Sequence, residues 1–217
     1  GFILSHTSMP VKVPDEKDID EFLPKREPQW LLDVDNPVTH GNIIMPKDYP
    51  KIRKAMQEAQ EKAKELIPKI AEEWKERFGT YHGGLIEKYR CEDADYILIS
   101  YAALGAESKV AIDKMRKEGI KIGLARLRSF RPFPVEDIAS LAKESDLIVI
   151  DRSISLGMEG PVFTEVKASL YGISGSKVYG FIAGLGGKDV TFKDIEKMCK
   201  KVVEDRYEGY EWYGIEG

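Results

Sequence analysis

The sequence has few residues that could bind a metal: two cysteines and three histidines in 217 residues. Cys91 and Cys199 lie more than 100 positions apart, which excludes a CxxC pair, a disulfide framework and a four-thiolate iron–sulfur site. His6, His40 and His82 are widely separated and show no metal-ligand spacing. We therefore expect this chain alone to bind no metal.

The sequence also lacks long apolar runs and an excess of positive charge. No stretch of about 18 apolar residues occurs, so no membrane span is expected. Lysine and arginine total 33 against 37 aspartates and glutamates, a net charge of −4, which disfavours nucleic acid as a partner. No secretory signal opens the chain, and the low cysteine content suits a reducing compartment, so the expected location is the cytoplasm.

Local catalytic motifs are missing as well. The sequence contains no GxxxxGK[ST], GxGxxG, HExxH or GxSxG motif. The nearest segment to a phosphate-binding loop, residues 184–189 (GLGGKD), has the wrong spacing. We therefore predict no catalytic, cofactor-binding or metal-binding residue in this chain.

The chain begins with an apolar segment and continues into a proline-rich one. Residues 1–7 (GFILSHT) read as the end of a preceding domain, which indicates a fragment; a tag scar is the alternative. Residues 8–50 hold seven of the eleven prolines, which disfavours regular structure. Their many apolar side chains predict an ordered strap that packs on a neighbouring surface.

A long helix is expected over residues 51–78, within a second region that runs from residue 8 to residue 84. Apolar residues recur there at steps of three and four and form one stripe. Pro68 should kink or split this helix, and Gly79 should end it. The stripe and the strap together predict association with another surface.

Residues 85–217 alternate between apolar strands and helices. Strands are expected at residues 96–101, 120–127, 147–151 and 178–183, with helices at about 107–118, 135–143, 161–171 and after 191. Crossovers of this length make the strands parallel, and continuous apolar runs indicate that both sheet faces are covered. The predicted fold class is α/β, a doubly wound, mostly parallel sheet.

Two glycine-rich turns follow the third and fourth predicted strands, at the sheet edge where open α/β folds bind ligands. Each precedes a helix whose N-terminal amides could hold an anion, and Arg152 lies beside the first turn. Glycines at such places also serve tight turns and close helix packing, which is the more frequent reason for them. The candidate glycines are Gly157, Gly160, Gly184, Gly186 and Gly187.

A basic cluster lies at the end of the second predicted strand. Arg126, Arg128 and Arg131 suit pairing with carboxylates or phosphates. We favour a salt-bridged contact with another domain or subunit over a substrate site.

Five segments in register resemble the α subunit of pyruvate-type 2-oxoacid:ferredoxin oxidoreductases. They are residues 1–7, 89–95, 118–124, 128–134 and 181–191. The resemblance begins where that subunit's pyrimidine-binding domain ends and continues through its transketolase C-terminal-like domain. It thus divides the chain into residues 1–7, 8–84 and 85–217.

The resemblance implies an enzyme that oxidatively decarboxylates a 2-oxoacid, pyruvate first. Thiamine diphosphate, Mg²⁺ and [4Fe–4S] clusters serve the complete enzyme, and its partners are other subunits, ferredoxin and coenzyme A as acyl acceptor. The family's reactive groups lie outside this segment. The resemblance therefore implies that this chain is inactive alone and has a structural and interface role.

One departure from the family pattern falls after the first predicted strand. The family usually has Met-Gly-Ser or Tyr-Gly-Ser there, whereas this chain has Tyr101-Ala102-Ala103. The change is compatible with another 2-oxoacid, such as oxalate. Two alternatives to the family role stay open: a stand-alone flavodoxin-like module that binds an anion or nucleotide, and the C-terminal domain of another thiamine-dependent dehydrogenase.

Overall fold

The computed structural model describes residues 6, 8, 10–28, 30–172, 175–205, 207 and 209–215. The chain divides into two compact units, Gly1–Ala59 and Gln60–Gly217, which are treated separately below.

The first unit has little regular structure. Helix α2 spans Glu16–Phe22, and helix α3, Tyr49–Phe78, begins in this unit and continues into the second. Many apolar side chains between these helices are exposed to solvent, although a strap packed on its neighbour would cover them. They include Leu23, Trp30, Leu31, Leu32, Val34, Ile43, Ile44 and Met45.

Helix α3 continues through Pro68. Of the two expected effects of Pro68, a kink or a split, the split does not occur. It ends before Gly79, which has the left-handed φ of 72°. None of the described α3 residues is buried. The predicted stripe is instead open to solvent, with exposed fractions of 39% at Ile52, 52% at Met56, 53% at Leu66 and 42% at Ile70.

The second unit is built on a six-stranded sheet in the order β1-β3-β2-β4-β5-β6. Its strands are β1 (Ile86–Tyr89), β2 (Tyr96–Tyr101), β3 (Ile122–Leu127), β4 (Asp146–Asp151), β5 (Val178–Ile182) and β6 (Gly209–Trp212). Its further helices are α4 (Ala102–Lys117), α5 (Val135–Leu141), α6 (Pro161–Ser169), the short 3-10 turn η1 (Leu185–Gly187) and α7 (Phe192–Asp205).

The sheet is mostly parallel, as predicted. Strands β2 to β6 run parallel to their neighbours, and only β1 runs antiparallel, against β3. Because β3 and β4 lie on opposite sides of β2, the chain reverses its winding direction there. The carboxyl ends of β2 and β4 therefore form a topological switch point, where open α/β sheets bind ligands.

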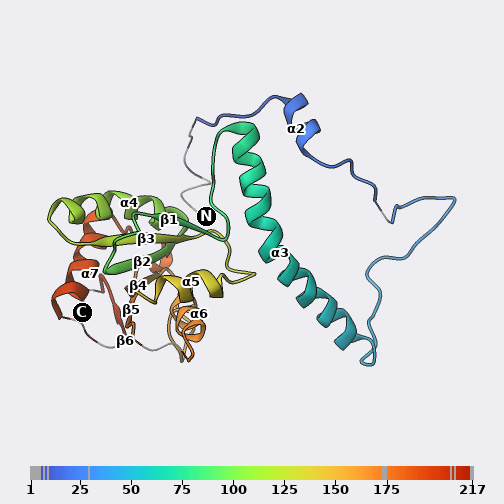
Figure 1. The fold of residues 1–217 in the computed structure, drawn as a ribbon. Helices are drawn as coiled ribbons and strands as arrows, with labels where there is room; N and C mark the ends of the chain where they lie inside the picture. Colours follow the sequence, from blue (N-terminus) through green and yellow to red (C-terminus); the bar gives the residue numbers. More distant parts are fainter. Residues whose placement is uncertain are drawn as a thin grey trace. The chain divides into compact units, whose positions relative to one another are not determined.

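Helices cover both faces of the sheet (Figure 1), which confirms the doubly wound α/β prediction. Successive residues of β2 point to opposite faces: Leu98 joins the core under α4 and α7, whereas Ile97 and Ile99 join the core under α5 and α6. All three side chains are fully buried. Two packed layers therefore fix the strand ends at which the candidate site lies. In the described part of the chain, no helix is long and apolar enough to cross a membrane.

Candidate functional site at the carboxyl edge of the sheet

A cavity of about 490 Å³ lies at the switch point of the sheet. It is bounded by the ends of β2 and β3, by the residues after β4 and by the first residues of α6. Its lining residues are Tyr101, Ala102, Arg126, Leu127, Arg128, Phe130, Ser153, Pro161 and Val162. The volume falls within the range of small-molecule sites.

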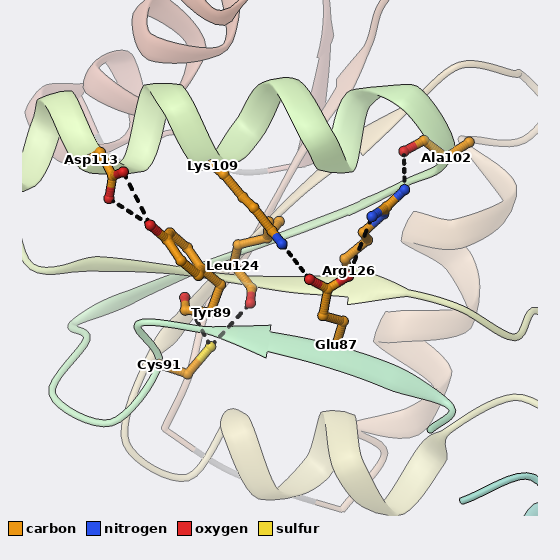
Figure 2. Close-up of polar contacts among 8 residues, drawn as sticks. All are labelled: Glu87, Tyr89, Cys91, Ala102, Lys109, Asp113, Leu124 and Arg126. Atoms are coloured by element: carbon orange, nitrogen blue, oxygen red, sulfur yellow. Dashed lines mark hydrogen bonds and ion pairs between the residues drawn. The ribbon is translucent and has the colours of Figure 1, made fainter. Parts of the chain in front are cut away.

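Arg126 is held in place by groups on two elements, β1 and α4 (Figure 2). Its Nη2 donates to the carbonyl oxygen of Ala102 at 3.0 Å, and its Nη1 pairs with Oε2 of Glu87 at 3.3 Å. Glu87 lies directly opposite Arg126 in the β1–β3 ladder. A Cβ on Gly105 of α4 would lie 2.5 Å from Cγ of Arg126, so only glycine allows this approach.

Glu87 is shared by two cations, because Lys109 of α4 also pairs with it. Burial alone would raise the pKa of Glu87, but Lys109 and Arg126 outweigh burial and hold its pKa below the usual value. One carboxylate thus faces two positive charges. The Nε atom of Arg126 is buried and has no hydrogen-bond partner among the described residues.

Ala102 has an unusual backbone conformation, with φ of 50°. This left-handed region favours glycine, and an alanine there costs about 1 kcal/mol or more. Ala102 therefore places a strained residue in the cavity wall.

The other two arginines of the basic cluster differ in their surroundings. The guanidinium of Arg128 is exposed and makes no ion pair or hydrogen bond with any described residue. Arg131 pairs with Glu165 of α6, donates to the carbonyl of Phe130 and stacks on the Phe130 ring at 4.4 Å. The structure thus brings Arg126 and Arg128 to the cavity, and Arg131 lies outside its lining.

The first glycine-rich turn is organised around Asp151, a fully buried carboxylate at the end of β4. Its oxygens accept hydrogen bonds from the backbone N–H groups of Val162 at 3.2 Å and Phe163 at 2.9 Å. Burial raises the pKa of Asp151, and these two donors oppose that rise. The amides that an external anion would use at α6 therefore hold the chain's own carboxylate.

Gly160 is required by this same contact. A Cβ at Gly160 would lie 2.2 Å from Oδ2 of Asp151, so a side chain cannot fit. Gly157, at the start of the turn, has φ of 83° with open space around it. Glu159 pairs with Lys167 of α6.

Polar groups at the second glycine-rich turn also form hydrogen bonds within the chain. Gly184, Gly186 and Gly187 have φ values of 71°, 64° and 86°, which the turn conformation requires. Arg152 donates from Nη2 to the carbonyl of Gly184 at 3.3 Å and so connects the two turns. The backbone N–H of Thr191, just before α7, donates to Asp194 at 2.9 Å.

The described residues do not fit a cluster, a metal or a bound diphosphate. No group of three or more His, Cys, Asp or Glu side chains is placed to hold a metal among them. Burial raises the pKa of Cys199 to about 12, and the half-buried thiol of Cys91 donates to the carbonyl of Leu124 at 3.2 Å. Both cysteines serve packing, and both helix N-termini already hold carboxylates of the chain.

Sequence reasoning identified the arginines of the site but not its walls. Tyr101, Ala102, Phe130 and Ser153 were not singled out as candidates for a binding site. The available signal was their position directly after strands of the sheet, since the carboxyl ends of parallel strands meet at one edge. Tyr101 is fixed there because its hydroxyl accepts the backbone N–H of Arg152 at 2.8 Å.

Comparisons with known proteins agree with the family resemblance. Residues 94–195 match the family described as pyruvate:ferredoxin oxidoreductase core domain II. The match includes strands β2 to β5 of the sheet.

Two relatives match along nearly the whole chain. The chain is 38% identical to pyruvate synthase subunit PorA of Methanothermobacter thermautotrophicus over 99% of this chain and 55% of that protein. It is 39% identical to ketoisovalerate oxidoreductase subunit VorA of Pyrococcus horikoshii over 99% of this chain and 57% of that protein. The chain is thus similar along nearly its whole length to the PorA and VorA subunits, which confirms the resemblance, and it spans little more than half the length of these relatives.

Among solved structures, a chain of 2-oxoglutarate:ferredoxin oxidoreductase from Magnetococcus marinus matches with a TM-score of 0.43 and 17% identity. That match covers 60% of this chain and 22% of the other.

Proposed function

We propose that this chain is the second-domain part of the α subunit of a multi-subunit 2-oxoacid:ferredoxin oxidoreductase. Its role there is structural: it supports the subunit interface while other domains and subunits carry thiamine diphosphate, Mg²⁺ and the [4Fe–4S] clusters. The observation that carries the proposal is the match to PorA and VorA over 99% of the chain.

The complete enzyme would oxidatively decarboxylate its substrate and pass the electrons to ferredoxin, with coenzyme A as acyl acceptor. Pyruvate is our first choice of 2-oxoacid. A relative named for ketoisovalerate is as similar as one named for pyruvate, so other 2-oxoacids, including oxalate, stay within the proposal. The lack of a cluster of metal ligands among the described residues supports an assignment of the chemistry to other parts of the enzyme.

The interface role is supported by the uncovered apolar stripe of α3. A stripe of this kind, left in water, favours association with another apolar surface. In the chain by itself, the exposed fraction of its side chains lies between 39% and 53% at Ile52, Met56, Leu66 and Ile70. We therefore expect this stripe to be buried in the assembled enzyme.

Co-purification tests this role. The double variant Leu66→Gln, Ile70→Gln in the full-length subunit should recover far less of the other subunits than the unchanged subunit does. The matched control is Lys62→Gln, Lys69→Gln, which changes exposed lysines on the same helix and should leave assembly intact. Equal recovery with both double variants would remove α3 from the interface.

A further inference from the structure

We propose that the cavity at the switch point binds an organic carboxylate with an apolar body, and that the guanidinium of Arg128 binds the carboxylate. This inference is independent of the proposed function, because it rests on the cavity and its lining alone.

The walls of the cavity indicate the apolar body of the ligand. The aromatic rings of Tyr101 and Phe130 and the aliphatic groups of Leu127, Pro161 and Val162 form most of the lining. Phe130 is 44% exposed, although it is a large apolar side chain. A volume of about 490 Å³ accommodates an aryl or branched alkyl group.

The charge of the cavity indicates that the ligand is an anion. None of the described lining residues is acidic, whereas two of them are arginines. The guanidinium of Arg128 has no partner among the described residues, and Arg126 shares the single carboxylate of Glu87 with Lys109. A carboxylate in the cavity would give the Arg128 guanidinium a charged acceptor.

The donors present favour a carboxylate over a phosphate. Phosphate sites on α/β folds usually rely on free backbone N–H groups at a glycine-rich turn and helix N-terminus. At this edge, the amides of Val162 and Phe163 already bind Asp151. The guanidinium groups remain, and their planar geometry suits a planar carboxylate.

The cavity is preorganised to bind such a ligand. Arg126 is fixed by the carbonyl of Ala102, by Glu87 and by its close approach to Gly105. Ala102 keeps a strained conformation at the cavity wall, and strained backbone is found most often at functional sites. The Arg126 side of the cavity is therefore ordered before a ligand binds, and only the Arg128 side chain remains to be ordered.

The test is calorimetric titration of the complete, assembled enzyme with naphthylacetate as the probe. Naphthylethanol has the same apolar body without the charge, and acetate has the charge without the body. We expect naphthylacetate to bind at least about tenfold more tightly than either, because both features of the site are needed.

Three variants locate the probe. Arg128→Gln should weaken naphthylacetate about tenfold and leave naphthylethanol unchanged, because it removes only the charge. Arg131→Gln, three residues away and outside the lining, is the matched control and should bind like the unchanged enzyme. Ser153→Phe fills the cavity and should weaken both naphthyl compounds.

Several results would overturn the proposal. One is equal binding of naphthylacetate and naphthylethanol, and another is an equal loss in Arg131→Gln and Arg128→Gln. Absence of probe binding would also overturn it, since it would mean that another polypeptide segment of the enzyme fills the cavity. Because Arg128 is exposed, its replacement should not prevent folding.

Discussion

Nη2 of Arg126 donates a hydrogen bond to the carbonyl oxygen of Ala102 at 3.0 Å, and this contact holds an alanine at a φ of 50°. The contact joins the end of β3 to the turn after β2, the two strands beside the cavity. The alanine at position 102 is thus a strained residue, and its carbonyl is bound by the Arg126 side chain.

Replacing Ala102 by glycine should raise the free energy of unfolding by about 0.5 kcal/mol. Glycine removes the strain of the left-handed conformation, and its greater freedom in the unfolded chain offsets part of that gain. Urea denaturation of the full-length subunit measures the change. The control is Ala103→Gly, which lies within α4 and should lower stability by about 0.5–1 kcal/mol. A loss of stability in both variants would contradict the account of Ala102.

Gly160→Ala should lower the free energy of unfolding by about 3 kcal/mol, because the new methyl group would displace Asp151 and leave buried amides without an acceptor. Gly157→Ala, in the same turn, meets open space and should cost only about 1 kcal/mol of conformational strain. Thermal denaturation of the two variants gives the comparison. Equal losses would show that the Asp151 contact does not constrain Gly160.

The capping contact before α7 predicts a pH dependence of stability. The Thr191 hydroxyl donates to Asp194 at 2.6 Å, and this bond, against a smaller effect of burial, holds the pKa of Asp194 below 3.8. A carboxyl whose folded pKa is lowered contributes stability above its unfolded pKa and loses it as the pH falls through the folded pKa. The contribution should therefore be complete from about pH 5 upward and be lost gradually as the pH falls below that toward the folded pKa.

Measurements of the free energy of unfolding between about pH 5 and pH 2 check this dependence. Asp194→Asn should lose less stability on acidification than the unchanged protein. Thr191→Val, which removes the hydroxyl donor, should flatten the profile less than Asp194→Asn, because the backbone N–H of residue 191 and the Tyr213 hydroxyl still donate to Asp194. Profiles that match the unchanged protein in both variants would rule out this contact as the cause.

The central strands could be predicted closely from the sequence because their apolar runs are continuous. The strand at residues 96–101 has the expected bounds, and the strand expected at residues 120–127 begins two residues later. Strands β1 and β6 were missed because each is a four-residue edge strand, Ile86–Tyr89 and Gly209–Trp212, with few buried side chains. Short edge strands depend on pairing with a neighbour rather than on their own pattern.

The site could be predicted only in part. The basic cluster was visible because arginines stand out in an apolar strand, but the cavity depends on packing among residues from 101 to 162. The hydrogen bonds from the first amides of α6 to Asp151 could not be predicted from a local motif either, since Asp151 lies 11 residues before Val162. Which residues an anion would meet is decided by such tertiary contacts.

The proposed role, support of an oxidoreductase whose chemistry lies in other domains and subunits, is best tested by an activity assay. The measurement is 2-oxoacid-dependent viologen reduction by the purified 217-residue chain, compared with the assembled enzyme under the same conditions. The account predicts reduction by the assembled enzyme and none by the chain alone. Substrate-dependent reduction by the chain alone would contradict it.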